Sequence, residues 1–431
     1  MKHFPQRWLI LSQYYAPEMG APQIRLRNFA RELRRLGIDV SVLTAMPNYP
    51  LGKIFEGYSG RWSVSEEIDG IPVKRLWVYA ANTRSGLARI ANYCSFAVSA
   101  MSVLFGPRPD VLFVESQPLP LGLVGLLMKW LRGVPYVYNV PDLQVDVARQ
   151  LGFLRGPALD LAFGFETMLL KNAWKVSTVT HAFVEHFVTR GVPAENITFL
   201  PNGADTAFLK PQPPSEELLD RLQLHGKKVI VSVGTMAYYQ ALDTIVEAAE
   251  KLAAHPEFVV LMVGSGPERE RIQELVKSKG LTNVQFPSIS YEESAQLYSI
   301  AYAAVATFRN VAVASRMRPS KLFPALSCGV PVVFSGCGEA AKLIEDNECG
   351  IAVPPEDSTA LAEAILKLAN DATLRQRFAR NGRVLAEREY SWSGIAERWL
   401  DGVRSGKGRF VGGLRELRND AGLPASGSGN P

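Results

Sequence analysis

The chain has 431 residues and a net charge of +5, with 47% apolar and 21% charged residues. These values are typical of a globular protein with more than one domain, and they exclude the dense Lys and Arg loading of a dedicated nucleic-acid binder. None of the four cysteines forms a C-x-x-C pair, so the sequence disfavours zinc ligation and disulfides and favours a reducing, cytoplasmic compartment.

Apolar strand patterns alternate with amphipathic helical patterns in the first half of the chain. Helices are expected at 24–36 and 121–131, among others. Continuous apolar strands joined by crossover helices indicate a parallel sheet covered on both faces. The strands are expected at residues 8–11, 40–44, 111–114, 136–139 and 176–179.

Residues 87–105 are apolar and nearly long enough to cross a membrane. They contain Arg89 and Asn92, and Gly106-Pro107-Arg108-Pro109 ends the segment before the strand at 111–114. We expect a buried helix of the parallel-sheet domain, with a membrane-facing helix as the alternative.

A proline-rich linker at 201–214 separates this half from a second alternation of strands and helices. The predicted fold class is α/β, with two Rossmann-like, doubly wound parallel-sheet domains facing a cleft. The expected domains are 1–203, which binds the acceptor, and 204–390, followed by a helix at 391–406 that crosses back and a disordered tail at 407–431. The second set of strands is expected at 229–233, 259–263, 284–286, 303–306 and 331–334, with helices at 241–253, 267–279, 291–299, 321–327 and 360–369.

Ligands of open parallel sheets bind beyond the carboxyl ends of the strands, which points to the loops that follow them. In the loop after the first strand, Glu18 and Gly20 are expected to contact an acceptor, together with Arg25 in the next helix. An ordinary connection and a solvated arginine face are the alternatives. Asp142 follows a buried strand and can bind sugar hydroxyls, sharing a helix face with Asp146, or it can cap the next helix.

The loops of the second half are suited to a diphosphate. Gly234 and Thr235 follow a strand and precede a helix, where backbone N–H groups and the helix dipole attract anions. Ser320 is a good N-cap, and Lys321 in the first turn opposes the dipole unless an anion binds there; Pro324 is tolerated in that turn. The sequence contains no D-x-D, H-E-x-x-H or G-x-S-x-G pattern, so no metal site or hydrolase triad is expected.

At these residues the chain resembles glycosyltransferase family 4, whose members are retaining enzymes of the GT-B fold. The resemblance extends from Trp8 to about Val403, and within the family it is nearest to bacterial surface-polysaccharide fucosyl- and fucosaminyltransferases of the colanic-acid type. It rests on Tyr15-Ala16-Pro17-Glu18, Ala45-Met46-Pro47-Asn48-Tyr49-Pro50, Asp142 through Asp146, Pro201-Asn202-Gly203-Ala204-Asp205, Val263-Gly264-Ser265-Gly266-Pro267, and Pro319-Ser320-Lys321-Leu322 before Gly329-Val330-Pro331-Val332.

The resemblance implies Asp142 and Lys321 as catalytic residues and a nucleotide diphosphate-sugar as co-substrate, with no cofactor. It also implies the donor-binding residues Gly234, Thr235, Gln240, Gly264, Ser320, Lys321, Leu322, Gly338 and Glu339. The chain departs from the family at Arg316 and Pro324, where many members have Glu, and at Pro141, where many have His. Thr235 and Gln240 stand where many members have Arg and Lys.

We therefore expect a metal-independent glycosyltransferase that acts on a lipid-linked glycan in cell-surface polysaccharide synthesis. Its expected partners are the donor, the acceptor and the anionic inner face of the plasma membrane, and nucleic acid is not expected. We expect the protein to attach to the membrane peripherally, through the arginines of 25–35. The alternatives are a nucleotide-sugar epimerase of the same fold and a non-catalytic subunit that binds sugar nucleotides.

Overall fold

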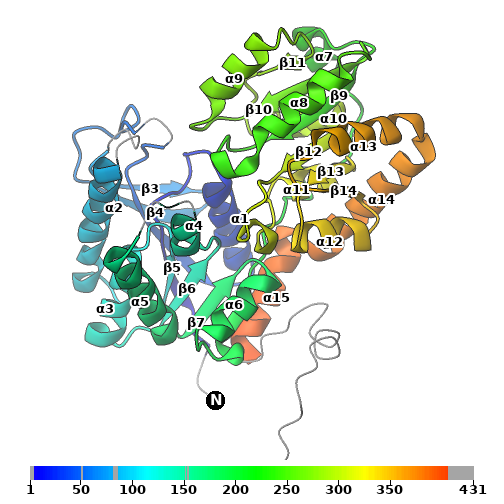
Figure 1. Ribbon diagram of the computed structural model, residues 1–431. Coiled ribbons are helices and arrows are strands. Elements are labelled where there is room, and N and C mark those ends of the chain that lie inside the picture. The colour runs from blue at the N-terminus through cyan, green and yellow to red at the C-terminus, as the bar shows by residue number, and fades with distance from the viewer. Residues whose placement is uncertain (1–3, 50–51, 81–85, 151, 153–154, 406–431) are drawn as a thin grey trace, which may run out of the picture.

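The computed structural model describes residues 4–49, 52–80, 86–150, 152 and 155–405, which form two α/β units joined by the segment 201–214 (Figure 1). Each unit is built on its own parallel sheet, so the predicted α/β architecture is confirmed. The expected tail at 407–431, and residue 406 of the expected last helix, lie outside the described residues.

The first sheet has the strand order β3-β4-β2-β1-β5-β6-β7-β8, and its pairs are parallel except for β3 with β4. In chain order this unit contains β1 (Arg7–Leu11), α1 (Ala21–Arg35), β2 (Asp39–Ala45), β3 (Ser63–Ile68), β4 (Ile71–Leu76), α2 (Gly86–Ala100), the 3-10 helix η1 (Met101–Phe105), β5 (Val111–Glu115), α3 (Leu121–Arg132), β6 (Tyr136–Val140), α4 (Gln144–Gln150), α5 (Pro157–Asn172), β7 (Lys175–Thr178), α6 (His181–Thr189) and β8 (Ile197–Phe199).

The second sheet has the order β11-β10-β9-β12-β13-β14 and is parallel throughout its described pairs. Its unit contains α7 (Glu216–Leu222), β9 (Lys228–Val233), the 3-10 helix η3 (Tyr238–Gln240), α8 (Leu242–Leu252), β10 (Phe258–Val263), α9 (Arg269–Ser278), β11 (Val284–Gln285), α10 (Ser294–Ser299), β12 (Ala301–Thr307), the 3-10 helix η4 (Ala314–Arg316), α11 (Leu322–Ser327), β13 (Val332–Ser335), α12 (Glu339–Asp346), β14 (Gly350–Val353), α13 (Ser358–Asn370) and α14 (Ala372–Glu389).

The last helix, α15 (Trp392–Ser405), leaves the second unit and packs on the first, beside α1. Trp399 is buried there against Phe29, with ring centroids 4.9 Å apart, and its indole N–H donates to Ser177 Oγ at 2.9 Å. This aromatic packing ties the end of the second unit to the core of the first.

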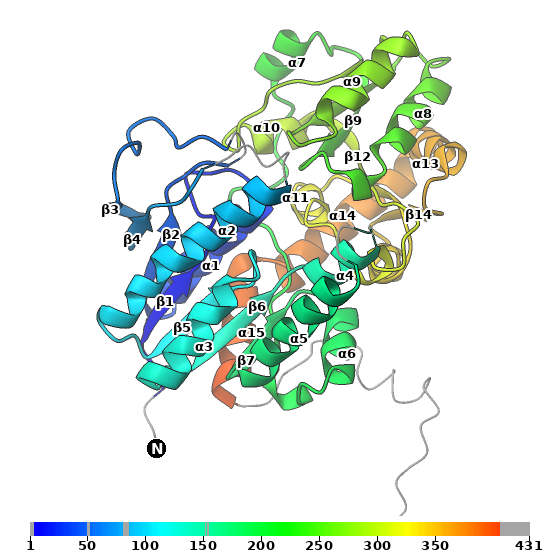
Figure 2. The same cartoon turned by 60° about the vertical axis from the view of Figure 1, so that its left-hand side comes forward.

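Helices cover both faces of the first sheet, as alternate residues of β1 show. Trp8 and Ile10 point to the layer that holds α1 and α15, whereas Leu11 points to the opposite layer. That opposite layer contains α2, α3 and α5, which lie side by side in Figure 2.

The segment 87–105 is a helix of the first unit, as predicted, but the prediction that it is buried is wrong. The stretch Gly86–Phe105 has the length and composition of a membrane span, but only 28% of its apolar window is buried. Phe96, Ala97 and Ala100 pack into the first core, while Leu87, Ile90 and Val98 are exposed. The sequence could not predict the exposure of this helix, because apolar composition does not show whether other parts of the protein cover it.

The sequence also missed the hairpin formed by β3 and β4. Polar residues alternate along β3 at the sheet edge, so the strand carries no continuous apolar run. The turn signal Asp69-Gly70 does lie between the two strands, with both residues at positive φ.

Candidate functional site

The loops after β9 and β10 approach each other closely at the carboxyl edge of the second sheet. Gly264 has a φ of +139°, and a Cβ at this residue would lie 1.9 Å from the carbonyl oxygen of Gly234. Only glycine fits this approach, which leaves backbone exposed where a ligand can reach it.

Lys321 lies at the same edge, beside Gly234 and Gln240. A Cβ on Gly234 would lie 3.3 Å from Lys321 Cε, and the Lys321 ammonium donates a hydrogen bond to Gln240 Oε1. The structure thus brings together three of the residues that the sequence assigned to donor binding.

The ammonium group of Lys321 is surrounded by protein although the residue remains partly exposed, and desolvation lowers its pKa to about 8. Within the described residues no carboxylate forms an ion pair with it. A buried cation without a carboxylate partner is a candidate binding group for an anionic ligand.

The structure corrects the expected start of α11. The helix begins at Leu322 with Lys321 at its N-cap position, and no side chain caps it, so the prediction of Ser320 as N-cap is wrong. The carbonyl oxygens of Pro319 and Ser320 already accept hydrogen bonds from the backbone N–H groups of Leu322 and Phe323. Leu322 is buried in the second core, and Pro324 falls in the first turn as expected.

Gly338 and Glu339 lie at the start of α12, against the first unit. Gly338 has a φ of +75°, and a Cβ there would lie 1.9 Å from the carbonyl oxygen of Ser315. The Glu339 carboxylate accepts hydrogen bonds from the backbone N–H groups of His181 and Ala182, at 3.2 and 3.1 Å. These bonds cap the N-terminus of α6, so Glu339 connects the two units here, and its contact with a donor stays a prediction.

Arg316, where many relatives have Glu, also lies at the junction between the units. Its Nη1 atom is 3.2 Å from Nδ1 of His186 in α6, and its carbonyl accepts from Thr180 Oγ1. Val313, three residues earlier, is buried in the core of the first unit. The segment after β12 is therefore docked on the first unit.

Asp142 follows β6 and faces the end of β5. It accepts a hydrogen bond from Gln117 Nε2 at 2.6 Å, and desolvation raises the pKa of its carboxyl group. Because α4 begins only at Gln144, Asp142 and Asp146 do not share a helix face, and that prediction is wrong. Asp146 pairs instead with Arg149, at 3.0 Å, and with His186.

Arg25 is buried, contrary to the expected direct contact with an acceptor. Its Nη2 atom lies 2.5 Å from Glu115 Oε1, and the side chain is 3% exposed. Glu115 also accepts from Asn139 Nδ2 at 2.8 Å, while its burial raises its carboxyl pKa. This pair supports the ends of β5 and β6 from inside the first unit.

Glu18 joins the loops that follow β1 and β2. Its carboxylate accepts backbone hydrogen bonds from Asn48 at 2.7 Å and Tyr49 at 2.8 Å, and burial raises its pKa to about 7. The Tyr49 side chain hydrogen-bonds to Thr235 across the junction. Gly20 is the N-cap residue of α1. Glu18 thus positions Tyr49 against the donor side, and direct acceptor contacts of Glu18 and Gly20 stay predictions.

Sequence reasoning missed Glu115 and Gln117, and it quoted Tyr49 in a family motif without assigning it a role. The run Glu115-Ser116-Gln117 directly follows the apolar strand β5, which is the position where parallel sheets carry functional side chains. That rule had found Asp142 after β6, and it applies equally to β5.

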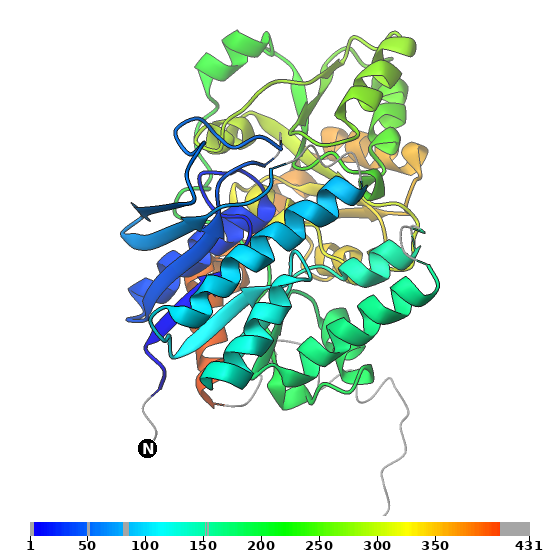
Figure 3. The ribbon, with the colours of Figure 1, turned by 90° about the vertical axis from the view of Figure 1, so that its left-hand side faces the viewer.

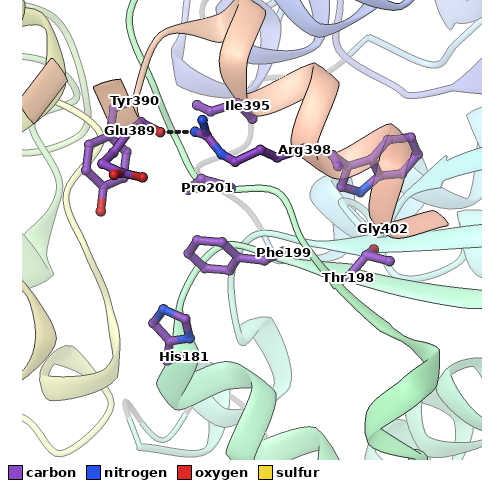
Figure 4. A pocket seen from close by; sticks show the side chains of 10 residues that line it. His181, Thr198, Phe199, Pro201, Glu389, Tyr390, Ile395, Arg398 and Gly402 are labelled. Atoms are coloured by element: carbon purple, nitrogen blue, oxygen red, sulfur yellow. Dashed lines mark hydrogen bonds between the residues drawn. The ribbon is translucent and has the colours of Figure 1, made fainter. Parts of the chain in front are cut away.

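A small cavity lies between α6, β8 and the segment from α14 to α15 (Figure 4), and Lys321 is not among its lining residues. His181 stacks on Phe199 with ring centroids 4.7 Å apart, and Arg398 donates to the carbonyl of Glu389. The cavity is lined by the segment that carries the chain from α14 into α15, so it belongs to the packing between the units.

Comparisons with known proteins agree with this geometry. Residues 20–203 match the family described as "Glycosyl transferase 4-like domain", and residues 215–385 match "Glycosyl transferases group 1". The chain is 28% identical over 409 residues to the "Putative colanic acid biosynthesis glycosyl transferase WcaI" of Escherichia coli K12, covering 92% of this chain and 99% of that protein.

Solved structures show the same fold. Sucrose-phosphate synthase from Thermosynechococcus elongatus superposes with a TM-score of 0.72 at 21% identity, covering 93% of this chain and 98% of that one. HepE from Anabaena in complex with UDP and glucose superposes with a TM-score of 0.70 at 19% identity, covering 93% of this chain and 100% of that one. The predicted GT-B type of two Rossmann-like domains is confirmed.

Proposed function

Because the chain belongs to the glycosyltransferases of group 1, we propose that it transfers a sugar from a nucleotide diphosphate-sugar to a hydroxyl of a lipid-linked glycan. The reaction retains the anomeric configuration, needs no metal ion and serves the synthesis of a cell-surface polysaccharide. The name of the Escherichia coli relative, a colanic acid biosynthesis glycosyl transferase, supports the last point.

The observation that carries the proposal is Lys321, placed beside Gly234 and Gln240 with no carboxylate partner among the described residues. A diphosphate at this position gains an ion pair with the ammonium group and approaches the backbone of Gly234. The complexes of HepE with UDP and glucose show that a protein of this fold holds a nucleotide and a sugar.

The proposed step breaks the bond between the anomeric carbon and the phosphate oxygen and forms one from that carbon to the acceptor oxygen. The departing diphosphate takes the acceptor proton, so the step requires no strong protein base. Lys321 stabilises the negative charge that develops on the leaving group, as a preorganised electrostatic contact does. Asp142, held by Gln117, binds sugar or acceptor hydroxyls.

The test combines binding with product analysis. A panel of UDP-, GDP- and dTDP-sugars, including fucose and fucosamine types, is screened for thermal stabilisation, because a ligand that binds the native state raises its stability. Stabilising donors are then incubated with lipid-linked glycans from surface polysaccharide synthesis, and NMR determines the anomeric configuration of the product.

The same assay separates the alternatives. A glycosidic product in which the anomeric configuration of the donor is retained supports the proposal. An epimerised sugar nucleotide would assign the protein to the epimerases, and donor binding without transfer or hydrolysis would indicate a non-catalytic subunit.

A further inference from the structure

Exposed apolar side chains are concentrated on one side of the first unit. Of the fifteen large apolar side chains that are exposed among the described residues, seven belong to α2, η1, α3 and α5, and only three lie beyond residue 204. Surface apolar groups that gather in this way mark an interaction site. We call the following set the α2–α3 face: Leu87, Ile90, Cys94, Val98, Phe105, Trp130 and Leu131.

The α2 residues of this face form a continuous strip, and the ends of α3 and η1 lie beside each other. Leu87, Ile90, Cys94 and Val98 are spaced three, four and four residues apart, so they share one face of α2 along about 16 Å. Arg132 donates to the carbonyl oxygens of Leu104 and Gly106, which holds the end of α3 against the end of η1. Figure 3 shows α2 on the outside of the unit with α3 beside it.

The elements that carry the strip, α2, η1 and α3, hold charges of one sign. Residues 86–109 and 116–141 contain no Asp or Glu, but they carry Arg89, Arg108, Lys129 and Arg132. Three of these side chains bond to backbone carbonyls: Arg108 to Gly133, Lys129 to Asn172 and Arg132 to Gly106. Their charge is therefore not cancelled by those contacts.

The arginines of α1, to which the sequence assigned membrane contact, are in a different situation. Arg27 forms two bonds with Asp69, at 2.6 and 2.9 Å, and Arg31 pairs with Asp205 at 2.7 Å. Arg35 pairs with Glu397 in α15 at 2.6 Å. These three charges are neutralised inside the molecule.

We propose that the α2–α3 face is the surface on which the protein rests on an anionic lipid bilayer. The apolar side chains enter the boundary between headgroups and acyl chains, and the basic side chains bind lipid phosphates. The helix lies in this interface and does not cross it, because Phe96, Ala97 and Ala100 on its inner side are packed in the first core.

This surface adjoins the acceptor side of the proposed site. Gln13 Nε2, in the loop after β1, donates to Asn92 Oδ1 of α2 at 2.6 Å, and Tyr14 hydrogen-bonds to Tyr93. A lipid-linked acceptor held in the bilayer therefore presents its head group to the loop that contains Glu18. In this respect the inference rests on the proposed function.

The first test is flotation with vesicles of phosphatidylglycerol and phosphatidylcholine. We expect the variant Leu87→Gln/Ile90→Gln/Val98→Gln to partition at least tenfold less than the wild type, and we expect high salt to weaken wild-type binding. The matched control is Val384→Gln, which changes an exposed apolar side chain on α14 and should bind as the wild type does.

A second test uses the exposed free thiols Cys94 and Cys337. An environment-sensitive fluorophore on Cys94 in a Cys337→Ser background should shift to the blue when vesicles are added. The same fluorophore on Cys337 in a Cys94→Ser background should not shift, because Cys337 lies in the second unit.

Unchanged vesicle binding by the triple variant would overturn the proposal. So would a wild-type dimer in the absence of lipid that the triple variant converts to a monomer, because the face would then join two copies. Donor-induced thermal stabilisation in the triple variant shows that it is folded. If the wild type binds vesicles through this face but transfers no sugar to any lipid-linked acceptor, the proposed function is wrong, whereas the proposal that this face binds the bilayer is retained.

Discussion

The ammonium group of Lys321 hydrogen-bonds to the side-chain oxygen of Gln240, a neutral group that only partly balances its charge. The two residues are 81 positions apart and meet beside Gly234, the residue that follows β9. A diphosphate that binds here exchanges this amide contact for an ion pair, and the first two predictions follow from that exchange.

Replacing Lys321 with Ala should remove most transfer activity. The variant loses one charge contact to the leaving diphosphate, which should raise the activation barrier by about 2–4 kcal/mol. Steady-state kinetics measure this loss. Urea unfolding serves as the control, because the lost hydrogen bond to Gln240 should cost only about 1 kcal/mol of stability. Near-normal turnover in this variant would contradict the role assigned to Lys321.

Donor affinity should fall as the pH rises through about 8. Desolvation lowers the pKa of Lys321 to about 8, so the residue is charged below this pH and neutral above it. Calorimetric titration with a nucleoside diphosphate between about pH 7 and 9 measures the effect. Lys321→Arg keeps its charge over this range and should show a flat profile. An equal decline in both proteins would mean that another group titrates.

Transfer should survive treatment with EDTA. The described residues contain no group of three or more His, Cys, Asp or Glu that could hold a metal ion, and the proposal assigns charge neutralisation to Lys321. Initial rates with and without chelator test this. Loss of activity that magnesium or manganese restores would refute metal independence.

Replacing Glu18 with Gln should change how stability depends on pH. Burial raises the pKa of Glu18 from 4.5 to about 7, so the folded state holds this proton more tightly than the unfolded state. Wild-type stability should therefore fall, relative to the variant, as the pH rises from 4.5 to 7, by about 3 kcal/mol in all.

Urea unfolding of both proteins at several pH values measures this difference. Glu67→Gln, which removes an exposed carboxylate on β3, controls for the loss of one charge. A constant difference between wild type and Glu18→Gln across the range would show that the three backbone N–H groups around Glu18 fully offset its desolvation.

Gly264→Ala should destabilise the protein and weaken donor binding together. The added Cβ would lie 1.9 Å from the Gly234 carbonyl oxygen, at a φ of +139°, so the cost should exceed about 1 kcal/mol. Gly164→Ala in α5 is the matched control. A Cβ there meets nothing within 4 Å, and it should stabilise the helix by up to about 1 kcal/mol. Equal thermal stability of the two variants would argue against the close approach of the β9 and β10 loops.

The sequence by itself determined the two parallel sheets and part of the donor side of the site. Strands such as 8–11 and 259–263 are apolar throughout, and that pattern depends only on neighbours along the chain. Gly234 and Lys321 could be found for the same reason, because strand ends and helix starts carry local signals.

Only the tertiary structure decided which charges are free and which surfaces are covered. Arg25 and Glu115 are 90 residues apart, and Glu339 reaches α6 from 157 residues away, distances over which no local pattern predicts a pairing. The exposure of α2 was predicted wrongly for a related reason. An apolar helix face has the same sequence pattern whether protein or lipid covers it, and only the packing of the neighbouring helices distinguishes the two.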